Sequence, residues 1–102
     1  MAIRRSVEEV LVVDGVRNQW VSRCEQALRS GGFGGVKVNT ALNQVEGVYH
    51  KFFVWGEIVV TLLPEGGNTK IVAKATANVD NIWALFSSPT KKILQTFKAG
   101  LA

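Results

Sequence analysis

Cysteine is nearly absent from the sequence, with Cys24 the single example in 102 residues. A disulfide framework and a cysteine-based zinc site both need several sulfurs at short spacing, so both are excluded. A single histidine, His50, and the lack of a carboxylate cluster leave no recognisable metal site, and no cofactor is predicted. Cys24 falls on the apolar stripe of a predicted helix and is expected to be a small core residue.

Long hydrophobic runs are missing as well. Charged residues interrupt every candidate before the roughly 18 apolar residues that a membrane span requires. Glu8 and Glu9 stand where a signal peptide would need a continuous apolar segment, so a cytoplasmic protein is expected. A chain with 47% hydrophobic and 20% charged residues is long enough to bury one core, which predicts a single domain over residues 1–102.

The positive charge is unevenly distributed. The formal net charge is +4, and the C-terminal third carries an excess of lysine that equals it. Such an excess allows an acidic partner such as nucleic acid or an anionic membrane surface. From residue 68 onward the charged residues are Lys70, Lys74, Asp80, Lys91, Lys92 and Lys98.

The first third of the chain predicts a strand followed by a helix. Residues 6–13 match a helix capping box at their start, but the β-branched run at 10–13 favours a strand. Asp14-Gly15 breaks this segment and offers a helix N-cap. Apolar residues then recur at helical spacing from Val16, and Ser30-Gly31-Gly32 ends the helix.

Three further strands are predicted in the middle of the chain. Residues 36–42 alternate as in a half-buried strand, 43–49 are less regular, and His50-Lys51 is the expected turn. The stretch 53–63 is apolar on both faces, and the loop 64–68 joins it in a β-hairpin to the strand 69–77. Ala73, Ala75 and Ala77 of that last strand would let a helix approach the sheet closely.

The tail predicts a helix in two pieces. Residues 82–86 form one or two turns, and Ser88-Pro89 restarts the helix with an N-cap and a first-turn proline. In the second piece one apolar stripe is expected to pack on the alanine row. The stripe consists of Ile93, Leu94, Phe97 and Leu101.

This order, β-α-β-β-β-α, predicts an α+β two-layer sandwich. An antiparallel sheet of about four strands would carry both helices on one face and leave the other face open. The strand 53–63 then has more apolar surface than two helices on one face can cover. Open apolar surface of this kind is where ligands and partner chains bind.

The second half of the chain resembles a group of small bacterial domains of uncharacterised function. The resemblance is carried by Phe53-Val54-Trp55-Gly56-Glu57-Ile58, by Gly67-Asn68-Thr69-Lys70-Ile71, and by Asn81-Ile82-Trp83 before a closing helix. The element order is also similar to one half of a TATA-binding-protein-like repeat. The resemblance implies the fold and a bacterial origin, and it supplies no chemistry.

The leading functional hypothesis is a binding module that uses the open sheet face. Its partner would be another protein, a second copy of the chain in a homodimer, or an apolar ligand. Trp55 lies either under the helices or on the open face, where Phe53 would join it in an aromatic platform. The predicted face consists of Phe53, Trp55, Glu57 and Val59.

Two other classes of function remain open at the sequence level. The open face would also carry Lys37, Lys70 and Lys74, which could contact the phosphates of a nucleic acid, although a solvated sheet face explains these lysines equally well. An enzyme would use Glu57 as general base. A structural glutamate is the simpler interpretation, because acid–base catalysis normally recruits a second ionisable group.

Overall fold

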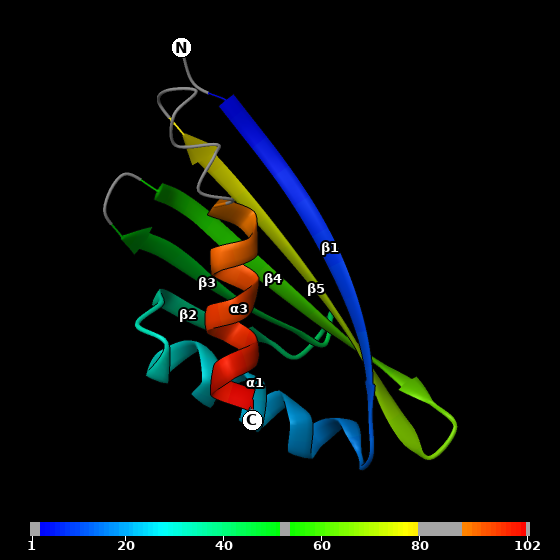
Figure 1. The fold of residues 1–102 in the computed structure, drawn as a ribbon. Coiled ribbons are helices and arrows are strands. Elements are labelled where there is room, and N and C mark those ends of the chain that lie inside the picture. The colour runs from blue at the N-terminus through cyan, green and yellow to red at the C-terminus, as the bar shows by residue number, and fades with distance from the viewer. Residues whose placement is uncertain (1–2, 52–53, 80–88, 102) are drawn as a thin grey trace.

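The computed structural model describes residues 3–51, 54–79 and 89–101, and within these ranges one antiparallel sheet carries two helices (Figure 1). The strands are ordered β1-β5-β4-β3-β2 across the sheet. The α+β class is therefore confirmed, and the strand number is corrected from about four to five. The elements are β1 (Ile3–Val13), α1 (Arg17–Ser30), β2 (Gly34–Asn39), β3 (Gln44–Lys51), β4 (Val54–Glu65), β5 (Asn68–Val79) and α3 (Pro89–Leu101).

The strand that the sequence pattern hides is β3. Its buried positions alternate as a strand should, with Val45, Gly47 and Tyr49 facing the core. Gly47 interrupts the apolar row because a Cβ there would lie 3.1 Å from the Cβ of Phe33. The expected turn at His50-Lys51 was wrong, because both residues belong to β3.

The turn between β2 and β3 comes earlier than predicted. The strand expected over 36–42 ends at Asn39, whose Oδ1 accepts a hydrogen bond from the Leu42 backbone N–H at 3.2 Å. Asn43 then adopts a left-handed conformation with φ of 52°, which asparagine tolerates better than most residues. Local side-chain bonding to the backbone thus ends the strand despite the alternating pattern.

The β4–β5 hairpin is confirmed and is tighter than expected. The two strands pair from Trp55–Asn78 to Glu65–Asn68, so that Gly66-Gly67 is the whole turn. Gly66 has a φ of +60° and Gly67 does not have a positive φ, which is the pattern of a type II′ turn with glycine at its first central position. The predicted loop 64–68 is therefore reduced to two residues.

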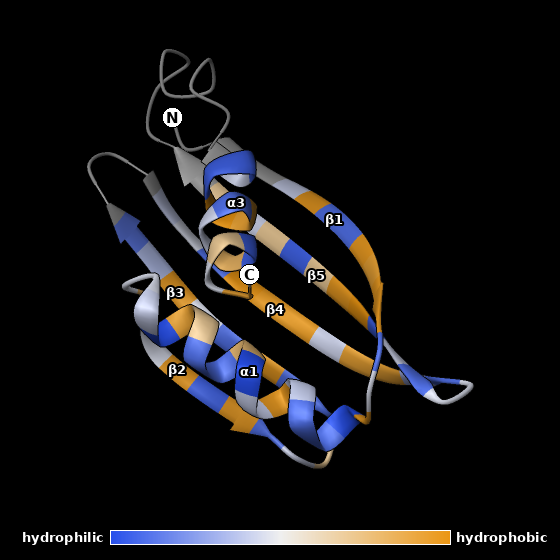
Figure 2. Cartoon of the chain, turned by 60° about the horizontal axis from the view of Figure 1, so that its bottom comes forward, coloured by the Kyte–Doolittle hydropathy of each residue, from blue (hydrophilic) through white to orange (hydrophobic). Residues whose placement is uncertain are grey.

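Both helices cover the same face of the sheet, as expected (Figures 1 and 2). In α3, Ile93, Leu94 and Phe97 are buried, and Leu101 packs against the core at its margin. The alanine row of β5 is buried beneath the helices, so the predicted packing of the helix stripe on small residues is confirmed. On the sheet, the larger core side chains are Val45, Ile58, Val60, Leu62 and Ile71.

The helices also meet one another at their ends. A Cβ on Gly100 of α3 would lie 2.8 Å from the Cα and 3.0 Å from the Cβ of Ala27 in α1, so the two helices approach closely only because Gly100 has no side chain. Lys98 Nζ lies 2.7 Å from Glu9 Oε1 and ties α3 to the edge strand β1. Of the described helices, neither is long and apolar enough to cross a membrane.

Two expectations concern the helix ends. Asp14 is not the N-cap of α1: that position is Val16, which provides no capping side chain, while the Asp14 carbonyl accepts a 2.6 Å hydrogen bond from Trp20 Nε1–H. The second helix piece begins at Pro89, as predicted. The first piece, predicted over 82–86, lies outside the described residues.

Candidate functional site

The sheet has a second face, turned away from both helices, which we call the outer face. Along β4, the buried residues Ile58, Val60 and Leu62 point to the helices. Successive side chains of a strand point to opposite sides, so the alternate residues of β4 belong to the outer face. These are Trp55, Glu57, Val59, Thr61 and Leu63, which confirms the division of this strand that its sequence predicts.

The outer face exposes large apolar side chains. Val10 and Val12 of β1 are 49% and 57% exposed, and Leu63 of β4 is 42% exposed. Val10 is the direct cross-strand partner of Val72, and Leu63 and Val12 flank Lys70 in one row. Toward the other end of the face, Val48 is 52% and Trp55 57% exposed.

Charged residues cross the middle of this face in one continuous line, which we call the charged row. Its members are direct register partners from one edge of the sheet to the other. Both ends and both intermediate positions are charged and exposed, and the central valine is partly exposed. The row runs Glu8, Lys74, Val59, Glu46, Lys37 across β1, β5, β4, β3 and β2.

Polar residues beside the charged row are tied to one another. The hydroxyls of Ser6 and Thr76 are hydrogen-bonded at 3.0 Å, and Gln44 Nε2 donates to Thr61 Oγ1 at 3.1 Å. Each pair consists of direct cross-strand partners. These bonds hold neighbouring side chains in fixed positions, so this part of the outer face has a fixed arrangement of polar groups.

The structure brings most of the predicted site residues together. Trp55, Glu57 and Val59 lie in sequence along β4 on the outer face, whereas Phe53 lies outside the described residues. All three predicted phosphate contacts are also on this face. Lys37 and Lys74 each have a glutamate as a direct neighbour, and Lys70 stands apart between two apolar residues.

His50 is a member of this face that the sequence analysis missed. Its ring meets the indole of Trp55 edge-on, with centroids 4.7 Å apart and an interplanar angle of 71°. It is also the diagonal neighbour of Glu57, which pairs with Val48. Only the register of β3 against β4 places His50 beside Trp55, and the turn that the sequence predicts at His50 would put the residue outside the sheet.

Cys24 belongs to α1 and is fully buried on the side of that helix that faces the core. Burial raises the pKa of its thiol to about 12, because the thiolate would lose its hydration. The thiol is therefore protonated and unreactive at neutral pH, as expected for a core cysteine. Within the described ranges no group of three or more histidine, cysteine or acidic residues is placed to hold a metal ion.

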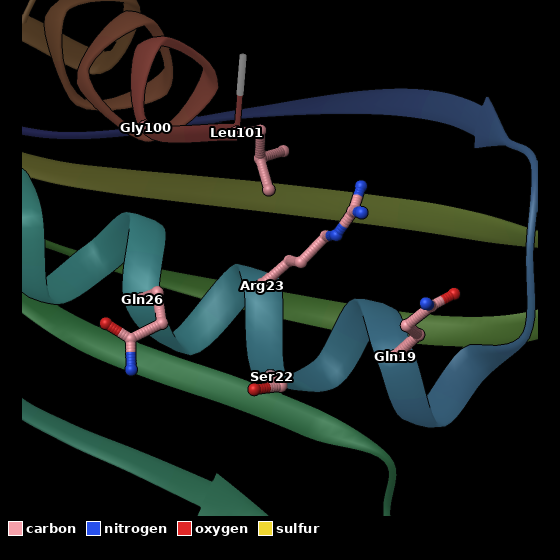
Figure 3. Close-up of a pocket in the computed structure, with 6 residues that line it drawn as sticks. All are labelled: Gln19, Ser22, Arg23, Gln26, Gly100 and Leu101. Atoms are coloured by element: carbon pink, nitrogen blue, oxygen red, sulfur yellow. The ribbon is translucent and has the colours of Figure 1, made fainter.

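The surface hollows described below show no set of polar side chains that points to a common centre. One of them, about 550 Å³, lies between α1 and the end of α3, and the side chains around it point in different directions (Figure 3). Another hollow, of about 340 Å³, lies between α1 and the β2–β3 turn. The outer face itself has a notch of about 160 Å³ beside Lys37, Glu46 and Glu57, which is small for an organic ligand.

No protein-family model matches the sequence, and no curated protein matches it. Solved structures match in fold. A norcoclaurine synthase point mutant from Thalictrum flavum, in complex with a transition-state analogue, has a TM-score of 0.69 at 9% identity over 99% of this chain and 93% of that one. The protein TTHA0849 from Thermus thermophilus has a TM-score of 0.65 at 10% identity over 95% and 94%.

A third match is the protein Mll3558 from Rhizobium loti, with a TM-score of 0.54 at 9% identity over 99% of both chains. At these identities the likeness concerns the fold alone. It establishes the helix-covered antiparallel sheet as a recurring arrangement and assigns no activity to this chain.

Proposed function

We propose that this protein is an interaction module that associates with a second copy of itself through the outer face of its sheet. The observation that carries the proposal is the set of exposed apolar side chains on that face. Val10, Val12, Val48, Trp55 and Leu63 each leave 42% or more of their surface open to solvent. Antiparallel sheets that face water normally alternate apolar and polar residues, and their wet side is polar.

The position and composition of the central strand also support self-association through the outer face. β4 lies in the middle of the sheet, and its outer residues are mostly apolar, with Glu57 the single charge among them. A central position is where a partner can exclude water most completely. Covering this strand therefore removes apolar surface that the helices cannot reach.

Other partners have weaker support. A nucleic acid would favour a continuous basic surface, but the charged row alternates in sign around Lys37 and Lys74. Small apolar ligands bind in hollows that enclose most of their surface, and the outer notch holds about 160 Å³. Catalysis by Glu57 would require the neighbouring His50 to act with it, and the His50 ring packs on Trp55.

Sedimentation of the purified chain over a range of micromolar concentrations tests the proposal. We expect a monomer–dimer equilibrium, and Val59→Asp should shift it to monomer, because a carboxylate would be buried at the centre of the contact. Val10→Asp, on the edge strand, is the second variant, and circular dichroism checks that both variants are folded. Val16→Asp is the matched control, since Val16 is 65% exposed at the start of α1, away from the outer face.

A wild-type chain that stays monomeric at the highest concentration contradicts the proposal. So does a dimer that both folded outer-face variants preserve. Association that Val16→Asp abolishes and Val59→Asp spares would place the contact on the helical side.

A further inference from the structure

We infer that the two copies pack sheet on sheet around a two-fold axis that runs along β4 and passes over Val59. The inference rests on the proposed self-association and adds its geometry and its specificity. It is carried by the order of charges in the charged row. In this arrangement Lys74 faces Glu46 of the partner subunit, and Glu8 faces Lys37 of the partner subunit.

The charged row of one copy is complementary in charge to the same row of a second copy turned by a two-fold axis. From β1 to β2 its charges are negative, positive, neutral, negative and positive, with Val59 at the centre. A two-fold axis along β4 exchanges the two sides of the row, so each position faces the one equally far on the other side of Val59. Both exchanged pairs join opposite charges, which gives four ion pairs in the dimer.

Other two-fold arrangements lose this match. An axis running across the strands would set each residue of the row opposite itself, so Glu8, Lys74, Glu46 and Lys37 would all meet like charges. Like charges in contact disfavour an arrangement, so the row selects one axis direction.

Packing geometry is compatible with these contacts. Face-to-face sheets lie about 10 Å apart and cross at about 30°, so partners close to the axis stay aligned and those farther away are displaced. Lys74 and Glu46 are one strand from β4 and keep the better alignment. Glu8 and Lys37 are two strands away, where the length of both side chains compensates for the displacement.

The size of the face sets the expected affinity. With about 4.8 Å between strands and about 3.3 Å per residue, the face from Trp55 to Leu63 covers about 500 Å² in projection. Stable interfaces bury about 800 Å² per partner, so we expect a reversible dimer with a dissociation constant in the micromolar range. In such a contact the charges decide which orientation forms.

Reciprocal charge reversal tests the axis. Lys74→Glu and Glu46→Lys should each weaken homodimer formation by about tenfold or more, because each places two pairs of like charges in the contact. An equimolar mixture of the two variants should form a heterodimer, since both contacts between positions 46 and 74 then join opposite charges: one is the native Glu46–Lys74 pair, and the other joins the two substituted positions. Native mass spectrometry distinguishes the heterodimer from either homodimer when one variant is labelled with ¹⁵N.

Lys91→Glu is the control, because Lys91 is exposed on α3 and belongs to the helical side. It has the same change of charge and should leave the homodimer intact. The double variant Lys74→Glu/Glu46→Lys should dimerise with itself.

The outcomes separate this inference from the proposed function. If the wild type dimerises and Val59→Asp prevents it, but the mixed variants stay monomeric, the outer face is the contact and the axis is wrong. If the wild type never dimerises, the proposed function fails as well.

Discussion

At the position of Gly56 in β4, the sheet and α3 are too close for any side chain. An added Cβ would lie 2.8 Å from Ile93 Cδ1 and in contact with the backbone oxygen of Thr76. The backbone oxygen cannot move without disturbing the β4–β5 pairing. Gly56 thus permits the buried contact of Ile93 with the sheet, which the three alanines of β5 also allow.

Gly56→Ala should therefore lower the free energy of unfolding by about 1–3 kcal/mol, the usual effect of overpacking a core. Urea denaturation followed by circular dichroism measures it. Gly67→Ala is the control, because a Cβ there meets nothing within 4 Å. A Gly56→Ala variant as stable as the wild type would show that α3 is free to shift.

The buried thiol of Cys24 makes stability depend on pH in alkaline solution. Its pKa is about 12 in the folded chain against 9.0 for an unperturbed thiol. Between these values the unfolded chain loses the thiol proton while the folded chain keeps it, so stability falls as the pH rises. Below pH 9.0 both states are protonated, and the contribution is fully present.

Unfolding free energies of the wild type and Cys24→Ala, measured by urea denaturation from neutral pH upward, test this dependence. The difference between them should decline above pH 9.0 by up to about 1.4 kcal/mol per pH unit. Taking the difference cancels the titration of lysine and tyrosine. A constant difference over the whole range would mean that the thiol of Cys24 is hydrated in the folded state.

Among the elements, α1 is the one whose start is poorly stabilised. Its N-cap, Val16, has the extended backbone of a capping residue but makes no side-chain hydrogen bond, and its first turn contains no acidic residue. An aspartate at that position could accept a hydrogen bond from a free backbone N–H and interact favourably with the helix dipole. Val16→Asp should therefore raise the free energy of unfolding by about 1 kcal/mol.

Thermal and urea unfolding measure the effect, with Val16→Ala as the control that removes the same apolar surface without adding a cap. Equal stability of the two variants would show that other groups already bind the free backbone N–H groups at the start of α1. The result also bears on association, because Val16→Asp should leave the dimer unchanged.

The elements also show how far the sequence predicts this fold. Strong periodicity located α1, α3 and the β4–β5 hairpin, because in each the apolar spacing matches the burial. β3 was missed because Gly47 takes a core position without an apolar side chain, so the alternation is broken in sequence but intact in space. Asp14 was misassigned as N-cap because its backbone carbonyl, which no pattern reveals, is bound by Trp20 instead.

For the whole molecule, the sequence predicted which face is open but not how its charges are arranged. Strand alternation alone places Trp55, Glu57 and Val59 on one side of β4, and the structure shows that this side is the outer face. The charged row joins residues from five strands, and its order depends on four separate registers. A shift of one residue in any register would move a charge to the other face, so the self-complementary order was invisible before the strands were paired.

Glu57 provides the last test of the dimer as a whole. It lies on β4 two residues from Val59, so the inferred axis places it near Glu57 of the partner subunit. Two neighbouring carboxylates repel each other, and water and salt screen the repulsion only in part. Glu57→Gln should therefore tighten self-association, by about threefold at low salt.

The same variant separates repulsion across the axis from a general effect of the side chain. Salt screens the repulsion, so the gain from Glu57→Gln should shrink as salt is added, whereas a better-packed amide would keep its advantage. Glu57→Asp retains the charge and should show no gain. Sedimentation at two salt concentrations measures all three chains. Weaker association of Glu57→Gln would mean that Glu57 faces a cation of the partner subunit, and β4 would then not lie on the axis.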